Sequence, residues 1–578
     1  MGKKNSALRS ARWYEQKSMR GSAHRQRTMQ LGFRRRDFMG KPVIGLINSW
    51  DEFSTCHGHL KARADDVRRG VWSAGGFPAE IPVPGLGEVM IKPTSMIYRN
   101  LLAMQVEEMI RAHPLDAVVL MGGCDKTTVG MLMGALSVDL PLIFMPAGPM
   151  LNANWRGLTI GAGTHTRKYW DELRAGTISE EDWAGLEESI CRSHGTCNTM
   201  GTASTMTCIV EAMGLTLPGA VTIPAVDSSH ARMAADCGER AVALAGDEAM
   251  RPSRLLKKQH FLNAVTTFMA LGGSTNAAVH LVAMAGRAGI DLGLDDIDAL
   301  SRSVPVIVDL LPAGRFLMED LHNAGGLPAV MAAISHKLDL GVSTVNGKTL
   351  GENLKSAKNW NPEVVRPLDN PLSGYSSLAV LRGNLAPNGA VIKPSAASES
   401  LMKHRGRAVV FENYPDLHAR IDAPELDVDE NSVLVLKGTG PKGAPGMPEW
   451  GGLPIPRKLL EKGVRDMVRI SDARMSGTHF GTVVLHVAPE AAVGGPLALV
   501  KDGDWIELDV EARRLHLDVP DEELAQRKAG PGTWNDDPTA RYKRGYTRLY
   551  IQHVTQADRG CDLDFLEGRS PDEEPDIY

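Results

Sequence analysis

Three of the seven cysteines lie in loops that would suit metal binding. Cys56 follows an apolar run at 42–50, Cys124 follows another at 116–123, and Cys197 lies in the Gly/Ser/Thr-rich stretch SHGTCNTMGTAST. Loops beyond the carboxyl ends of parallel strands converge on the ligand crevice of an α/β sheet. Three thiolates from three such loops would suit a soft metal ion or an iron–sulfur cluster with one open iron. A small buried hydrophobe is the alternative role for any one cysteine, because their wide spacing matches no regular metal motif.

The segment GGCDKTT places Asp125 and Lys126 directly after Cys124. Asp125 is a hard oxygen ligand that suits magnesium or calcium. Lys126 cannot bind a cation as an ammonium, so it would have to lose its charge or be converted covalently to a carboxylate. The alternative is a surface Asp–Lys pair on the first turn of a helix, where the aspartate favours the amino-terminal dipole. The residue types alone leave both interpretations open.

Ser476 lies in DARMSGTHFG (472–481), ahead of the apolar run TVVLHVA. A hydroxyl in this setting could act in catalysis or could satisfy the backbone of a turn, which is the commoner role of serine beside glycine. The sequence has no GxSxG, HExxH or GxxxxGK motif, so a serine hydrolase, a zincin and a P-loop NTPase lack support. The stretches at 201–206 and 272–280 could cradle an anion at helix starts or cap those helices.

The elements that must position these residues form an alternating pattern after Lys41. Strands are predicted at 42–50, 77–84, 116–123 and 141–148, and helices at 57–76 and 95–113 with a further helix before the last strand. Apolar strands without alternation, interleaved with helices, indicate a parallel sheet covered on both faces. We therefore predict an α/β domain over residues 1–370.

The second part of the chain has a different pattern. Short apolar runs separated by Gly, Pro, Asn and Asp turns occur at 377–383, 408–413, 432–438, 482–488 and 504–519. This pattern predicts a β-rich, barrel-like domain over residues 371–578. The boundary rests on the turn residues of PLDNPLSGYSS (367–377).

Composition excludes several other classes of protein. The chain has 64 Lys+Arg against 69 Asp+Glu, so it is not a nucleic-acid binder that works by bulk positive charge. No apolar run approaches the ~18 residues of a membrane-spanning helix. Seven scattered cysteines without a CxxC pair indicate free thiols or metal ligands in a reducing compartment. The basic first 41 residues could be a transit peptide, but Trp13, Tyr14 and Glu15 and the lack of an apolar face favour a cytoplasmic protein.

Seven segments carry a further signal and run in order from about residue 40 to about residue 500. They are NSWDEFSTCHGHL, GGCDKTTVGMLMGA, GTCNTMGTASTM, LGGSTNAAVHL, LRGNLAPNGAVIKPSAAS, GPKGAPGMPE and RISDARMSGTHFGTVVLHVAPEAAVGGPLALV. Together they closely resemble the family of dihydroxy-acid, phosphogluconate and aldonic-acid dehydratases.

The resemblance implies two inorganic cofactors and a catalytic serine. The three cysteines of its iron–sulfur cluster match Cys56, Cys124 and Cys197. Its magnesium site is matched by Glu88, Asp125, Lys126 as a carbamate, and Glu449, whereas its proton-abstracting serine falls on Ser476 with Thr478 beside it. The other four cysteines, Cys191, Cys208, Cys237 and Cys561, are not expected to bind the cluster.

Two features are similar to the sugar-acid branch of this family. The loop at the third cysteine reads GTCNTMGTAST rather than the Cys-Gly-Gly-Met type, and the first magnesium carboxylate is Glu88 rather than an aspartate. Pentonate dehydratases, those for L-arabinonate in particular, look most similar. The resemblance therefore implies a 2Fe-2S cluster rather than 4Fe-4S, a small sugar acid as substrate, and a dimer or tetramer.

Two alternatives are kept for comparison. The first is a dihydroxy-acid dehydratase of branched-chain amino-acid synthesis, or an enzyme that serves both substrate classes. The second is a non-catalytic iron–sulfur sensor, which is disfavoured because a sensor needs neither Ser476 nor the four magnesium positions.

Overall fold

The computed structural model describes residues 8–529, 538–569 and 574–577. Its amino-terminal part is built on a four-stranded sheet in which every neighbouring pair is parallel, with the order β2-β1-β3-β4. The strands are β1 (Val43–Asn48), β2 (Phe77–Pro82), β3 (Ala117–Gly122) and β4 (Leu142–Pro146). The predicted parallel α/β architecture is confirmed.

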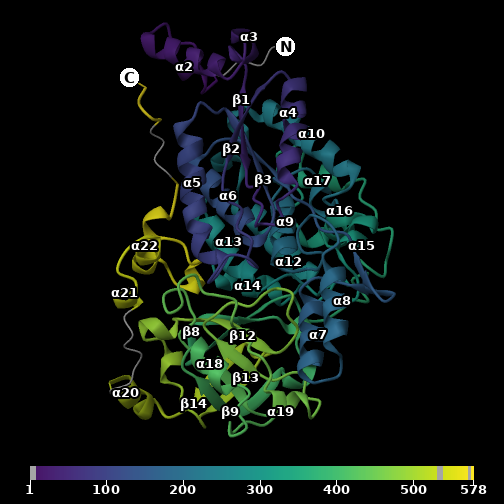
Figure 1. Ribbon diagram of the computed structural model, residues 1–578, viewed down its shortest axis with the longest axis vertical. Coiled ribbons are helices and arrows are strands. Elements are labelled where there is room, and N and C mark those ends of the chain that lie inside the picture. Colours follow the sequence, from purple (N-terminus) through teal and green to yellow (C-terminus); the bar gives the residue numbers. More distant parts are fainter. Residues whose placement is uncertain (1–7, 530–537, 570–573, 578) are drawn as a thin grey trace.

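Helices cover both faces of this sheet (Figure 1). One face carries α4 (Leu60–Ser73) and α10 (Ser228–Leu244), and the other carries α5 (Arg99–Ala112) and α6 (Asp125–Val138). This division is what right-handed crossovers between parallel strands require for the strand order observed. The helix α6, which begins at the predicted site residues, is therefore held against the centre of the domain.

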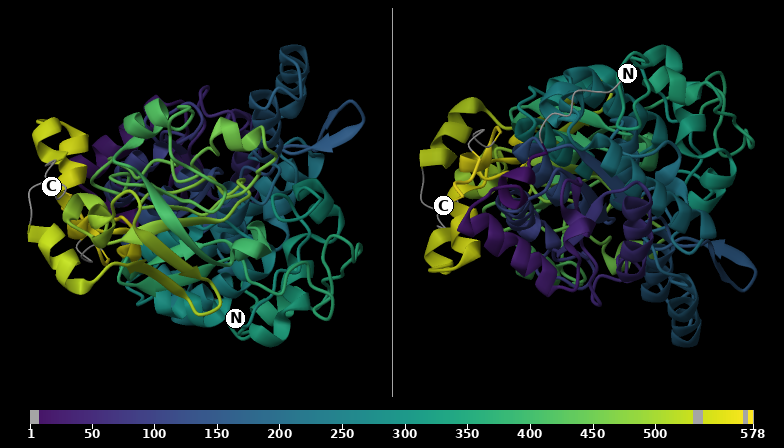
Figure 2. Two further views of the ribbon diagram at one scale, coloured as in Figure 1. Left: turned by 90° about the horizontal axis from the view of Figure 1, so that it is seen from below. Right: turned by 90° about the horizontal axis from the view of Figure 1, so that it is seen from above.

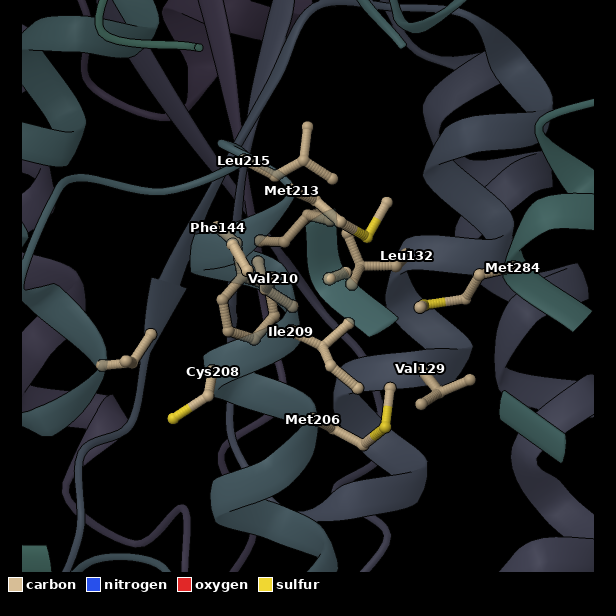
Figure 3. Close-up of a cluster of buried hydrophobic side chains, with 14 of the residues drawn as sticks. Val129, Leu132, Phe144, Met206, Cys208, Ile209, Val210, Met213, Leu215 and Met284 are labelled. Atoms are coloured by element: carbon tan, nitrogen blue, oxygen red, sulfur yellow. The ribbon is translucent and has the colours of Figure 1, made fainter. Parts of the chain in front are cut away.

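The helix α6 is buried along its whole length up to Ser137. A Cβ on Gly134 would lie 2.4 Å from the backbone oxygen of Ala103, so α5 approaches α6 closely only because this position is glycine. On its other side α6 meets α9 (Thr202–Ala212), and Figure 3 shows Met206 and Ile209 of α9 facing Val129 of α6. Cys208 lies in the same apolar cluster, as expected for a cysteine outside the site.

The rest of the amino-terminal part is mainly helical. A hairpin of β5 (Ala153–Trp155) and β6 (Leu158–Ile160) precedes α7 (Thr164–Arg174) and α8 (Glu180–Ile190), and these four elements (blue) lie at one edge of the molecule in Figure 2. The α-helices that follow α10 in this part are α11 (Pro252–Leu255), α12 (Lys258–Leu271), α13 (Asn276–Arg287), α14 (Leu294–Ser301), α15 (Met318–Asn323), α16 (Gly326–Ala333) and α17 (Leu350–Leu354). No helix in the described ranges is both long and apolar enough to span a membrane.

The carboxyl-terminal part is a closed barrel with the strand order β10-β11-β12-β8-β7-β14-β13-β9. Its strands are β7 (Ala379–Gly383), β8 (Ala386–Ile392), β9 (Lys403–Phe411), β10 (Val433–Leu436), β11 (Arg469–Ser471), β12 (Val483–Ala488), β13 (Trp505–Asp509) and β14 (Arg514–Asp518). The predicted β-rich barrel is thus confirmed. The strands β9, β10, β11 and β12 are parallel neighbours, so their carboxyl ends lie at the same end of the barrel.

The chain returns to the amino-terminal part after the barrel. The buried Arg99 of α5 donates to the backbone oxygen of Cys561 at 2.8 Å, and the buried Arg287 of α13 donates to Asp562 at 2.6 Å. The segment around residue 560 therefore ties the end of the chain to α5 and α13. The domain boundary at residue 370 stays a prediction.

Candidate functional site

Loops that follow parallel strands of both parts meet in one place. Cys56, Glu88 and Cys124 lie beyond the carboxyl ends of β1, β2 and β3, whereas Glu449 and Ser476 lie beyond those of β10 and β11. The carboxyl ends of parallel strands are where α/β sheets bind their ligands. The loops after the parallel barrel strands meet the loops after the parallel sheet strands, as the contact between Lys126 and Glu449 shows. The site is therefore built from both parts of the chain.

Lys126 lies at the centre of three carboxylates. Its Nζ is 3.1 Å from Glu88 Oε2 and 3.1 Å from Glu449 Oε1, and it also contacts Asp125 Oδ2. Burial and the nearby Arg474 oppose the ammonium charge, but the three carboxylates outweigh them and raise the pKa of Lys126. Because Lys126 and Asp125 are both buried, the surface Asp–Lys pair is excluded.

Other side chains hold two of these carboxylates in place. Glu449 Oε1 accepts from Arg474 Nη1 at 3.1 Å and from Asn276 Nδ2 at 3.2 Å. Burial acts to raise the pKa of Glu449, but Lys126 and Arg474 outweigh it and lower the pKa to about 2. Glu88 accepts from the hydroxyl of Thr94 at 2.7 Å. Glu449 is therefore ionised, and it and Glu88 are both held within 3.1 Å of Lys126 Nζ.

Cys124 adopts a backbone conformation that is unusual for a residue with a side chain. It precedes α6 with φ 53° and ψ 158°, a combination that costs about 1–3 kcal/mol outside glycine. The turn is fixed by Gly123, whose N–H donates to His57 Nε2 at 3.1 Å and whose Cβ, if present, would lie 2.6 Å from Ala147 Cβ. In this turn the Cys124 Sγ lies 3.3 Å from Asp125 Oδ1.

The cysteine thiols are close enough to affect one another's ionisation. A hydrogen bond from Cys124 lowers the pKa of Cys56, and the same bond, together with burial, raises the pKa of Cys124. Burial, together with Cys56, raises the pKa of Cys197 to about 12. Thiolates bind metals, and forming those of Cys124 and Cys197 requires a cation to offset the cost of burial.

The donor types at this site fit both implied cofactors. Cysteine sulfurs suit an iron–sulfur cluster, and the carboxylates that already surround one positive charge suit a hard divalent cation. Within the described ranges no three His, Cys, Asp or Glu side chains converge closely enough to hold a metal ion as they stand. The assignment of both ligand sets therefore stays a prediction.

Ser476 and Thr478 form a tight hydroxyl pair. Their Oγ and Oγ1 atoms are 2.9 Å apart, and the N–H of Thr478 lies 3.4 Å from Ser476 Oγ. The loop packs against Gly201 and Gly163, where added Cβ atoms would lie 2.9 Å and 2.6 Å from the Thr478 side chain. Ser476 is thereby held between the barrel and the start of α9.

Sequence reasoning missed several side chains that the structure brings to the site. Asn276 and Arg474 lie inside two of the quoted motifs, so their proximity to Glu449 could have been suspected from those segments. His57 is next to Cys56 in the sequence, but its role in the turn at Gly123 depends on a contact between two loops. Arg167 of α7, whose Nη1 donates to Thr478 Oγ1 at 2.6 Å, lies in no motif and gave no signal.

Two models of one protein family match the two parts of the chain. The family model "Dihydroxy-acid/6-phosphogluconate dehydratase N-terminal" matches residues 41–353, and its C-terminal counterpart matches residues 363–561.

Several curated relatives match along nearly their full length. A 6-deoxy-6-sulfo-D-gluconate dehydratase of Pseudomonas putida is 55% identical over 100% of this chain and 99% of the relative. An L-arabinonate dehydratase of Rhizobium leguminosarum bv. trifolii is 52% identical over 97% of this chain and 96% of the relative. A dihydroxy-acid dehydratase of Caldicellulosiruptor bescii is 41% identical over 91% of this chain and 95% of the relative. The resemblance seen in the motifs therefore holds for the chain as a whole, which belongs to the dihydroxy-acid/6-phosphogluconate dehydratase family and is a hydro-lyase.

Proposed function

We propose that this enzyme dehydrates a 2,3-dihydroxy sugar acid, such as the pentonate L-arabinonate, to the 2-keto-3-deoxy acid. The observation that carries the proposal is the position of Lys126 among Glu88, Asp125 and Glu449. Asp125 of this group also contacts Cys124 Sγ at 3.3 Å. This arrangement juxtaposes sulfur and oxygen donor sets at a single site. The dehydratases of sugar acids among the relatives, at 50–55% identity, support the same substrate class.

Two ligand sets follow from this proposal. Cys56, Cys124 and Cys197 would hold a 2Fe-2S cluster, and Glu88, Asp125, carbamylated Lys126 and Glu449 would hold magnesium. When bound, the cluster would supply a Lewis acid for the carbon 3 hydroxyl, and magnesium would stabilise negative charge next to the substrate carboxylate.

The protein's own groups would handle the proton at carbon 2. Ser476 as an alkoxide takes this proton, so the C–H bond breaks, an O–H bond forms on Ser476, and hydroxide leaves carbon 3. The resulting enol then tautomerises to the keto acid. Thr478 supports Ser476 through the hydroxyl contact at 2.9 Å. Because a serine at its ordinary pKa is too weak a base near neutrality, its anion must be stabilised by its surroundings.

A second candidate substrate is 6-deoxy-6-sulfo-D-gluconate, which the relative at 55% identity favours. The dihydroxy-acid dehydratases named among the relatives are 38–41% identical, so branched-chain dihydroxy acids are the weaker alternative. A cytoplasmic location and a dimeric or tetrameric assembly stay predictions.

The decisive experiment is a substrate panel on anaerobically purified, cluster-replete enzyme. The panel contains L-arabinonate, other pentonates, 6-deoxy-6-sulfo-D-gluconate and 2,3-dihydroxy-isovalerate, with keto-acid formation as the measurement and the Ser476→Ala variant as the background. We expect the largest kcat/KM for a sugar acid. A larger value for 2,3-dihydroxy-isovalerate would favour the branched-chain alternative, and no keto acid from any member would overturn the proposal.

A further inference from the structure

Arg167 reaches the serine loop from α7, across the boundary between the two parts of the chain. Its Nη1 donates to Thr478 Oγ1 at 2.6 Å, and Thr478 Oγ1 lies 2.9 Å from Ser476 Oγ. A guanidinium has only donors, so Thr478 must accept from Arg167 with a lone pair. The hydroxyl hydrogen of Thr478 is then free to point at Ser476. The three side chains form a hydrogen-bond relay that ends on Ser476 Oγ; either hydroxyl of the pair can donate while Ser476 is neutral, but only Thr478 can donate once Ser476 is an alkoxide.

The two arginines Arg167 and Arg174 of α7 differ in how their charges are paired. In the part of the chain that the structure describes, no carboxylate forms a salt bridge with Arg167, whereas Arg174 on the same helix pairs with Asp422 at 3.0 Å. Burial lowers the pKa of Arg167, but an arginine stays protonated in proteins. Thr478 therefore receives a charge-assisted hydrogen bond, about twice as strong as a neutral one.

The electrostatic surroundings of the loop are mixed. Glu449, Cys197 and Asp171 act on Arg167, and Arg167 and Arg469 act on His479 of the serine loop. Glu449 in turn lies near Lys126 and Arg474. Burial and Arg167 keep the pKa of His479 well below its usual value, so this histidine is neutral. Arg167 is the cation among them that donates directly to the hydroxyl pair.

We propose that Arg167, acting through Thr478, stabilises the alkoxide form of Ser476 and so sets the pH range in which this serine acts as a base. The inference rests on the proposed function. In the step concerned, the Ser476 O–H bond breaks and the proton passes to solvent. The Thr478 hydroxyl then donates to the new alkoxide while Arg167 keeps its own protons. Arg167 is thus a positioning residue that acts through Thr478.

The test is the pH profile of kcat for Arg167→Met against wild type. The acidic limb of this profile reports the base in the enzyme–substrate complex. Losing a hydrogen bond to a charged group should move that limb upward by about one to two pH units, or roughly ten- to a hundredfold in kcat on the limb. Arg167→Lys, which keeps a charged donor, should move it less. Arg174→Met removes a cross-domain contact of the same helix and should leave the limb in place.

Two further measurements separate a relay from other roles. Thr478→Val should shift the limb as Arg167→Met does, and the double variant should shift it no further, because both changes cut one relay. A rise in KM alone would instead indicate that Arg167 binds the substrate. Additive shifts, or an unmoved limb in an active variant, would overturn the inference. If Arg167→Met fails to fold, as judged by melting temperature, Thr478→Val and Arg167→Lys carry the same test.

A measurement without substrate keeps this inference distinct from the proposed function. Modification of Ser476 by a small organofluorophosphonate can be followed against pH by peptide mass spectrometry. The pH at which wild-type Ser476 becomes reactive should rise in Arg167→Met and not in Arg174→Met. If no acid of the panel is dehydrated, the proposed function fails, yet this profile still decides the role of Arg167. Equal profiles in all three proteins would overturn that role.

Discussion

Lys126 Nζ and Glu449 Oε1 lie 3.1 Å apart, although Lys126 is in the first turn of α6 in the amino-terminal part and Glu449 follows β10 of the barrel. The pair shows how the two parts build a single site. The pair also belongs to a buried cluster of charges whose net charge can be compared between two forms. An ammonium among three carboxylates gives the same net charge as a carbamate and a divalent cation among them. The two forms could therefore be exchanged without altering the net charge of this buried cluster.

The proposed magnesium site predicts how Lys126→Ala changes the metal content and activity of the enzyme. Removing the lysine removes the group that would carry the carbamate, so the variant should lose magnesium and activity but keep most of its iron. Metal analysis of the purified variant checks this. Lys437→Ala is a suitable control, because Lys437 is also buried and pairs with a carboxylate, Glu412 at 3.0 Å, in the barrel. A structure of active, magnesium-loaded enzyme with an unmodified ammonium at Lys126 would contradict the prediction.

The assignment of three cysteines as cluster ligands predicts loss of the iron–sulfur cluster when any one of them is replaced. Serine at Cys56, Cys124 or Cys197 should abolish the visible absorbance of the cluster, because a serine hydroxyl replaces a thiolate ligand poorly. Cys191 is exposed and influences the pKa of Cys197, so Cys191→Ser is the matched control and should keep the cluster. Normal iron and sulfide content in Cys124→Ser would contradict the assignment of Cys124 as a cluster ligand.

The sequence was sufficient to predict the parallel sheet, because apolar runs such as DAVVLMGG are long and bounded by glycines. Parts of the barrel were harder to predict. The strand β11 (Arg469–Ser471) spans three residues, and β8 (Ala386–Ile392) contains Pro387, Asn388 and Gly389, which have the pattern of a turn. Barrel closure supplies the hydrogen bonds that make these segments strands, and closure is a property of the whole domain.

The same limit applies to the site. Cys124, Asp125 and Lys126 stand together in the sequence, so their proximity was predictable. The contact of Lys126 with Glu449 spans the two parts, and only the resemblance to a family suggested it. Arg167 belongs to no motif, and its contact with Thr478 depends on how α7 packs against the barrel. Spacing along the chain carries no information about such packing.

Ser476→Ala should remove the base and leave the ligand sets in place. We expect turnover to fall by the ~10²–10⁴ typical of losing a general base, with iron and magnesium retained. Exchange of the carbon 2 hydrogen with solvent, measured by NMR in deuterated buffer, should vanish together with dehydration. If the variant keeps more than about a tenth of wild-type turnover, the base is another residue. Thr478, whose hydroxyl lies 2.9 Å away, is then the first to test.

The burial of Lys393 predicts that the stability of the protein depends on pH, independently of catalysis. Lys393 follows β8, is 3% exposed, and its Nζ has no hydrogen-bond partner among the residues that the structure describes. Burial lowers its pKa from 10.5 to about 7. Between these two values the unfolded chain binds more protons than the folded one, so stability falls as the pH falls from about 10.5 to about 7. Below pH 7 the whole penalty is present, on the order of a few kcal/mol.

Lys393→Met should therefore stabilise the protein most at pH 6 and least near pH 10, because a methionine has no charge to bury. Urea unfolding of the variant and wild type at both pH values measures the difference. Lys437→Met is the contrasting control: it removes a buried lysine that has a partner, so it should destabilise the protein at pH 6. An equal effect of Lys393→Met at pH 6 and pH 10 would show that Lys393 finds a partner in solution and stays charged across this range.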